Sequence, residues 1–183
     1  MTELFSVIRM AYAATFADAV ASSASAHVEA ALRRDDGSLA LDGEYDLPMR
    51  ADLVPRWGSQ AGKLLTVDSH TRMQFSVHTL PLPPAIVYVA PFVWDDVALR
   101  IGGLAPQQVG AVLAPWFMDW FDAEDANRLN EEGLFGVVHF ASDPRPEGAM
   151  VAVELDLGSA PVQALEDLLA RLAAAGARDI RLA

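Results

Sequence analysis

The 183-residue sequence contains no cysteine and a single lysine, Lys63. The absence of cysteine excludes disulfide frameworks, thiolate zinc sites, iron–sulfur clusters and thiol nucleophiles. Neither Gly-x-Ser-x-Gly nor His-Glu-x-x-His occurs, so two well-marked catalytic motifs are missing as well. No uninterrupted apolar run reaches the about 18 residues that suggest a membrane-spanning helix, so we expect no membrane span.

Acidic residues outnumber basic ones by 25 to 13, which gives a formal net charge of -12 at pH 7. A chain of this charge is repelled by nucleic-acid phosphates and by anionic membrane surfaces, so we expect neither as a partner. Hydrophobic residues make up 52% of the sequence and charged residues 21%, which excludes a disordered chain. A positive mean hydropathy of +0.22 predicts extra apolar surface, and we expect a homodimer to cover it.

The length fits one domain that spans residues 1–183, and the segment 48–62 is the best place for a boundary if one exists. The segment 58–63 is similar to a phosphate-binding loop, but it has one residue too few between its glycines. It is also followed by Leu64 where that loop has Ser or Thr. We therefore expect no cofactor.

The N-terminal region predicts one long helix. Apolar residues recur every third or fourth position from Phe5 to Val20, and the spacing continues through Ser23 and His27 towards a stop at 35–37. Ala24-Ser25-Ala26 is similar to the cleavage site of a secretion signal. No basic residue precedes the apolar stretch, however, and Asp18 lies inside it. We expect a folded helix and a cytoplasmic protein.

The middle of the chain is typical of β-structure. Asp42-Gly43 predicts a hairpin turn, and alternating or apolar residues predict strands at 64–67, 73–79, 86–90 and 97–101, with a loop forced by 81–84. An aromatic-rich helical stripe runs from Val109 to Phe121 with Pro115 inside it, which predicts a kink or two consecutive helices. A buried strand is expected at 134–140.

The C-terminal residues 151–182 read as strand, helix and strand, which predicts a parallel crossover. The predicted fold class is therefore α+β. It has a mixed, mainly antiparallel sheet, a long N-terminal helix, a central aromatic-rich helical segment and a C-terminal parallel βαβ unit. Ser159, between the strand and the helix of that unit, is expected to cap the helix.

The segment 116–132 combines aromatic residues with clustered carboxylates. Carboxylates attract a basic partner and aromatic side chains anchor contacts, although the same pattern fits a core-facing stripe with a solvated back. The hypothesis that we place first is a non-catalytic interaction protein, such as an adaptor, a chaperone or an immunity-type inhibitor of a basic protein. Its predicted partner-binding residues are Asp119, Asp122, Glu124, Asp125, Glu131 and Glu132.

A second hypothesis is a small-ligand-binding protein or an enzyme, with a pocket formed by Arg72, Gln74, His78 and Tyr88. A set of Asp68, His70, His78 and His139 offers metal-ligand chemistry, but its spacing matches no metal motif. We therefore predict no metal site, and we expect His139, on an apolar segment, to be a hydrogen-bonded core residue.

Overall fold

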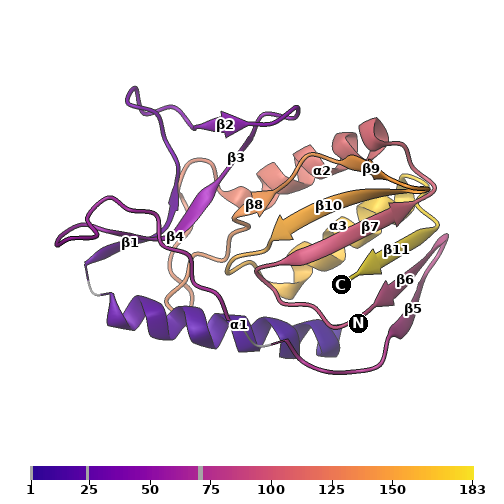
Figure 1. Cartoon of the computed structure of the whole chain (residues 1–183), viewed down its shortest axis with the longest axis horizontal. Coiled ribbons are helices and arrows are strands. Elements are labelled where there is room, and N and C mark those ends of the chain that lie inside the picture. The colour runs from indigo at the N-terminus through magenta and orange to yellow at the C-terminus, as the bar shows by residue number, and fades with distance from the viewer. Residues whose placement is uncertain (1, 24, 70–71) are drawn as a thin grey trace.

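The computed structural model describes residues 2–23, 25–69 and 72–183, and it shows an α+β architecture (Figure 1). In these residues the helices are α1 (Thr2–Ser22), α2 (Pro106–Phe121) and α3 (Val162–Ala174). A mixed seven-stranded sheet is built from β5 (His78–Leu82), β6 (Ala85–Val89), β7 (Val97–Gly102), β8 (Phe140–Ala141), β9 (Arg145–Glu147), β10 (Met150–Asp156) and β11 (Asp179–Leu182).

The strand order of this sheet is β5-β6-β11-β7-β10-β8, with β9 also paired to β10. β11 runs parallel to β6 and antiparallel to β7, and β10 is antiparallel to β7. β10 and β11 are therefore parallel to each other with β7 between them. The predicted C-terminal βαβ unit of β10, α3 and β11 is confirmed. Its two strands are not neighbours, because β7 lies between them in the sheet.

Helices α2 and α3 lie behind the sheet in Figure 1 and pack against one face. Along β7 the side chains of Val97, Leu99 and Ile101 are buried in the core, whereas Ala98 and Arg100 on the opposite face are half-buried. This alternation reflects the two-residue repeat of a strand with one core-facing side. The other sheet face carries Arg100 and Glu154 together with the apolar Ile86 and Ala98.

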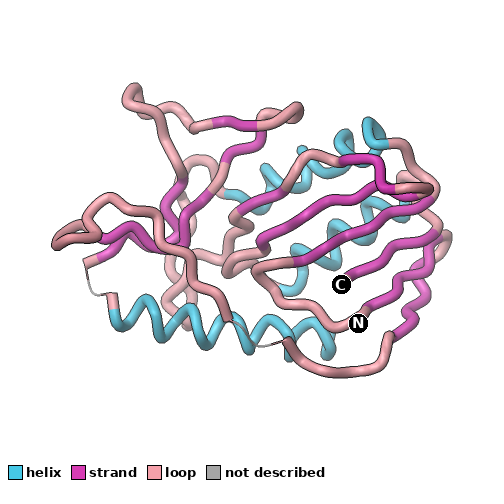
Figure 2. The backbone as a smooth tube through the Cα atoms, in the orientation of Figure 1, coloured by secondary structure: helices cyan, strands magenta, loops and turns pink. Residues whose placement is uncertain are grey.

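Two small antiparallel pairs stand beside the main sheet (Figure 2). β1 (Ala26–Ala31) pairs with β4 (Arg50–Pro55), and β2 (Leu41–Asp42) pairs with β3 (Leu47–Pro48). The second pair is the predicted hairpin at Asp42-Gly43, where Gly43 has a positive φ of 76°. The sequence did not predict the first pair. Arg50 and Asp52 interrupt the apolar run that would mark β4 as a buried strand.

Helix α1 buries Phe5, Ile8, Tyr12 and Phe16 in the core, as the spacing predicted. It ends at Ser22 rather than near residue 35, so this part of the prediction is wrong. Alanine and serine supply little apolar side chain to hold a further helix against the core, and pairing with β4 draws residues 26–31 into a strand instead. By length and composition α1 could cross a membrane, a property that core helices and signal sequences share.

Several other expectations need correction. Residues 72–77 form no strand, and β5 includes Pro81, which an edge strand tolerates because an outward position needs no N–H donor. Residues 64–67 make only the single bridge from Leu65 to Leu53. The segment 134–139 is buried but irregular, and only Phe140 and Ala141 join the sheet. Helix α2 is continuous through Pro115.

Candidate functional site

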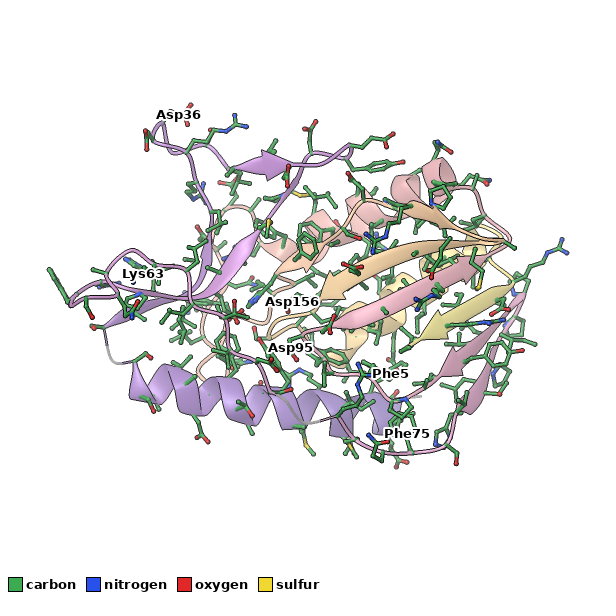
Figure 3. The ribbon with its side chains drawn as sticks, viewed as in Figure 1. Phe5, Asp36, Lys63, Phe75, Asp95 and Asp156 are labelled. Atoms are coloured by element: carbon green, nitrogen blue, oxygen red, sulfur yellow. The ribbon has the colours of Figure 1, made fainter. Side chains whose placement is uncertain are left out.

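His139 lies at the centre of a buried charged cluster where β4, β10 and α1 meet. Its side chain is 0% exposed, as the sequence led us to expect of a core histidine. Nδ1 is 2.7 Å from Oδ1 of Asp52, and Nε2 is 2.7 Å from Oε1 of Glu29. Oδ2 of Asp156, at the end of β10 above α1 in Figure 3, lies 3.8 Å from Nδ1. One imidazole is thus surrounded by three carboxylates.

The two closest carboxylates come from opposite positions of the β1–β4 pair. Val28 pairs with Leu53 and Ala30 with Ala51, so the intervening Glu29 lies across from Asp52. Like charges directly opposite each other destabilise a sheet, and here the imidazole lies between them. Glu29 has a positive φ of 48°, which a non-glycine residue rarely adopts.

Backbone amides bind the remaining oxygens of the cluster. The N–H of Phe135 donates to Oε2 of Glu29 at 2.7 Å, and that of Val67 donates to Oδ2 of Asp52 at 2.6 Å. The N–H of Gly158 donates to Oδ1 of Asp156 at 2.8 Å. These contacts tie segments far apart in the sequence to one histidine.

The carboxylates decide the charge of the histidine. Burial by itself lowers the pKa of His139, but Asp156, Asp52 and Glu29 outweigh burial and raise that pKa to about 10. Burial raises the pKa of Glu29, yet the hydrogen bond and charge of His139 leave it below its usual range. Burial also raises the pKa of Asp156 to about 7. At neutral pH the cluster is therefore an imidazolium that two or three carboxylates surround.

These pKa values predict that the protein loses stability as the pH rises. His139 binds its proton up to about pH 10 when folded but only to 6.5 when unfolded, so its stabilisation is complete below pH 6.5 and is lost towards pH 10. Asp156 acts in the same direction between 3.8 and about 7. The lowered pKa of Glu29 has the opposite effect: its contribution to stability is lost only as the pH falls below the ordinary pKa of 4.5. Each extra folded-state proton contributes a slope of about 1.4 kcal/mol per pH unit.

Urea denaturation at several pH values, at about 0.05 M and about 0.5 M NaCl, checks this prediction. General repulsion among surface carboxylates also falls with added salt, whereas a buried titration does not. The decline of the unfolding free energy above neutral pH should therefore persist at high salt. A flat profile at high salt would show that His139 is not charged in the folded protein.

Arg50 joins this cluster to residues 122–132, the acidic segment that follows α2. Its buried guanidinium donates to the carbonyl oxygens of Glu29, Phe121 and Asp122 and to Oδ1 of Asp125. It also lies 4.6 Å from the ring centroid of Phe121. The end of α2 and the start of the acidic segment are therefore held against β4.

An open groove lies between β1 and the segment 122–135, with a volume of about 410 Å³. All six residues of β1 line it, together with Val20 at the end of α1. The rest of the lining comes from the segment 122–135, from β4 and from the residue that follows β4. These residues are Arg50, Arg56, Asp122, Asp125, Leu129, Gly133 and Phe135. The groove thus combines a strand edge, apolar side chains and charged groups.

Three of the six predicted partner-binding acids form ion pairs within the chain. Such pairs neutralise much of the local charge that would attract a partner. They are Asp119 with Arg171 at 2.9 Å, Asp125 with Arg33 and Arg50 at 2.8 Å each, and Glu132 with Arg9 at 2.6 Å.

The other three acids have different environments. The carboxylate of Asp122 accepts hydrogen bonds from the N–H groups of Ala126 and Asn127, at 2.9 Å each. Glu124 and Glu131 are exposed and have no ion-pair partner among the residues that the structure describes. They are therefore the free negative charges of this segment.

The alternative pocket residues lie before and on the edge strand β5 and on its neighbour β6. Arg72, Gln74 and His78 are exposed, and Tyr88 lies on β6 with the guanidinium of Arg181 5.8 Å from its ring. None of the four lines the groove beside β1 or the cavity at Asp52 and Asp156.

The metal set of the sequence analysis is also separated. His78 lies on β5 at one edge of the sheet, whereas His139 precedes β8 at the other edge. Asp68 lies on the loop that follows Leu65, and His70 falls outside the described residues.

Sequence reasoning missed Glu29, Asp52 and Asp156, since nothing local relates three acids that are so far apart. The one usable sign was a histidine inside the apolar run 134–140. Ser159 was expected to cap α3, and this is wrong. Its hydroxyl instead accepts hydrogen bonds from the N–H groups of Gly136 and Val137, at 2.8 Å and 3.2 Å.

Comparison with known proteins finds no match. No family model, curated protein or solved structure is similar enough to this chain to count as one. What the chain binds is therefore inferred from its own residues.

Proposed function

We propose that this protein is a non-catalytic binding protein that holds an extended, basic segment of a partner protein in the groove beside β1. The observation that carries the proposal is that the whole of β1, Ala26–Ala31, lines this groove. In the described part of the chain β1 pairs with β4 alone, so its second edge has no strand beside it. An extended peptide binds such an edge by adding a strand through backbone hydrogen bonds.

Apolar side chains supply anchoring contacts for such a peptide. Leu129, on the wall opposite β1, is 57% exposed, and Phe135 lines the same groove. Trp57 follows the groove residue Arg56 and is 75% exposed. Exposed leucine and tryptophan beside a groove are typical of contact sites, in which a few such residues supply most of the binding energy.

Charge favours a basic partner. The chain carries a net charge of -12, and the groove wall 122–135 includes Glu124 and Glu131, which are free to meet external cations. A field of this sign accelerates encounter with a basic surface. Arg50 and Asp125 also line the groove and form an ion pair with each other. Because the pair holds both groups in their charged forms, it favours a binding role over proton transfer.

The test uses labelled peptides of about eight residues in which Lys or Arg alternates with Val or Leu, measured by fluorescence polarisation. Peptides with Glu in place of the basic residues serve as the comparison. We expect the basic peptides to bind, to bind less tightly as salt rises, and to shift the amide resonances of 26–31 in NMR spectra. Binding by neither set, or shifts elsewhere only, would overturn the proposal.

A matched pair of leucine variants locates the site. Leu129→Ser is expected to weaken peptide binding at least about five-fold, because it removes a groove anchor. Leu64→Ser alters a leucine that is equally exposed, at 57%, but lies outside the groove, so it should leave affinity unchanged. Equal losses in the two variants would place binding elsewhere.

A further inference from the structure

Three ligand atoms of the buried cluster converge on one point. These atoms, from Asp52, His139 and Asp156, all lie within 4.8 Å of one another. Nδ1 of His139 is 2.7 Å from Oδ1 of Asp52 and 3.8 Å from Oδ2 of Asp156. Bonds of about 2.0–2.2 Å place neighbouring ligands of a small metal ion about 3 Å apart. Small side-chain movements are enough to bring the three atoms around one cation.

The contacts behind these atoms are those of a supported metal site. Oε1 of Glu29 lies 2.7 Å from Nε2 of His139, so an Nε2–H donated to Glu29 leaves Nδ1 free to act as a ligand. Backbone amides hold the outer oxygens of Asp52 and Asp156 at 2.6 Å and 2.8 Å. The inner oxygens of both aspartates therefore remain directed towards the histidine.

Tyr12 on α1 provides an independent observation. Its side chain is 1% exposed, and its hydroxyl has no hydrogen-bond partner in the described parts of the chain. Its ring centroid lies 5.6 Å from that of Phe16, whose ring packs 5.9 Å from the ring of His139, so Tyr12 borders the cluster. Burial, together with the charges of Asp156 and Asp52, raises the pKa of Tyr12 far above its usual range. Buried polar groups almost always have a partner, and a cation with a bound water in the cluster would supply one.

A cavity gives access to the cluster. It has a volume of about 260 Å³ and is lined by Asp52 and Asp156 together with Leu65, Thr66 and Phe140, among others. The side chain of Asp156 is 23% exposed, so a hydrated ion reaches its carboxylate without unfolding of the core.

We propose that Asp52, His139 and Asp156 bind a divalent transition-metal ion such as Zn²⁺ or Mn²⁺, with the hydroxyl of Tyr12 facing its remaining coordination position. One imidazole with two carboxylates suits these ions, whereas Mg²⁺ and Ca²⁺ prefer oxygen ligands alone. In the metal-bound form the imidazole is neutral and the ion takes the place of its Nδ1 proton. This inference does not rest on the proposed peptide binding, because its three ligands do not line the groove.

Isothermal titration of the chelator-treated full chain with ZnCl₂ alone, and with MnCl₂ alone, tests the proposal. We expect one ion per chain and a melting temperature that rises with metal concentration. Asp156→Asn should lower metal affinity at least about ten-fold. Asp179→Asn, which changes a surface carboxylate paired with Arg181, is the matched control and should bind as the unmodified chain does.

The visible spectrum of bound Co²⁺ gives a second measurement that reports on the ligands themselves. Tyr12→Phe keeps the buried ring and removes only the hydroxyl, so it should fold and alter this spectrum, as should Asp156→Asn. The proposal is overturned if neither Zn²⁺ nor Mn²⁺ binds saturably. It is equally overturned if Asp156→Asn binds metal as tightly as Asp179→Asn and both give the spectrum of the unmodified chain.

Discussion

Replacing His139 with leucine is expected to lower the free energy of unfolding by about 3–5 kcal/mol. Leucine fills the core position with an apolar side chain, but the carboxylates of Glu29 and Asp52 lose their common partner. Both carboxylates are buried, so water cannot replace the imidazole. Urea denaturation in the presence of a chelator, near pH 7, measures the loss without a contribution from metal.

Two comparisons separate charge from packing in this experiment. His78→Leu changes an exposed histidine and should alter stability by less than about 0.5 kcal/mol. Adding Glu29→Gln and Asp52→Asn to His139→Leu should recover part of the loss, because the amide oxygens still accept from the backbone while the buried charges are gone. A loss below about 1 kcal/mol for His139→Leu, or no recovery in the triple variant, would show that the cluster does not stabilise the fold through charge.

Gly158→Ala should be nearly as damaging, because the added methyl would overlap the same histidine. A Cβ at Gly158 would lie 2.3 Å from Cδ2 and 2.5 Å from Nε2 of His139. The ring cannot move aside, since both of its nitrogens are held and Phe16 packs against it at a centroid distance of 5.9 Å. Overpacking of this kind costs about 1–3 kcal/mol.

Backbone strain adds to that cost, since Gly158 has a positive φ of 49° and an L-residue there costs a further about 1–2 kcal/mol. Gly148→Ala is the matched control, because Gly148 has a φ of 61° but no atom within 4 Å of the added Cβ. Chemical denaturation should show the second cost alone in Gly148→Ala and both costs in Gly158→Ala. Equal destabilisation of the two variants would mean that the ring of His139 yields to the methyl.

Both predictions concern the same structural role. His139 follows the segment that comes after α2, while Glu29 and Asp52 belong to the β1–β4 pair and Gly158 to the loop after β10. The histidine therefore joins the small sheet to the main one. Because Glu29 and Arg50 also line the groove, a change at the cluster is expected to alter the shape of the proposed binding site as well.

Elements with strong periodicity were predicted well from the sequence. The strands β7 and β10 and the helices α2 and α3 each have one buried face. Apolar residues therefore recur at the period of the strand or the helix, among residues close in sequence. The parallel βαβ unit followed from three such elements in a row. Strands without a periodic apolar pattern were missed. β4 carries Arg50 and Asp52 at buried positions, and β1 is composed of residues that also suit a helix.

The candidate site was predicted only in part. His139 was expected to be a hydrogen-bonded core residue, and it is. The six acids of 119–132 were grouped by sequence alone, and the structure pairs three of them with arginines that come from α1, β4, α3 and the chain after β1. That this segment binds a partner stays a prediction. The proposed contact residues are now Glu124, Glu131 and the lining of the groove beside β1.

The sequence by itself determined the α+β class, the core-facing stripes and the absence of thiol chemistry, because each depends on composition or on residues a few positions apart. The tertiary structure alone decided which carboxylates meet His139, where α1 ends and which acids remain free. These outcomes depend on contacts between residues separated by 87 and 110 positions. Local propensity says nothing about such pairs, and the cost of burying an unpaired charge decides them.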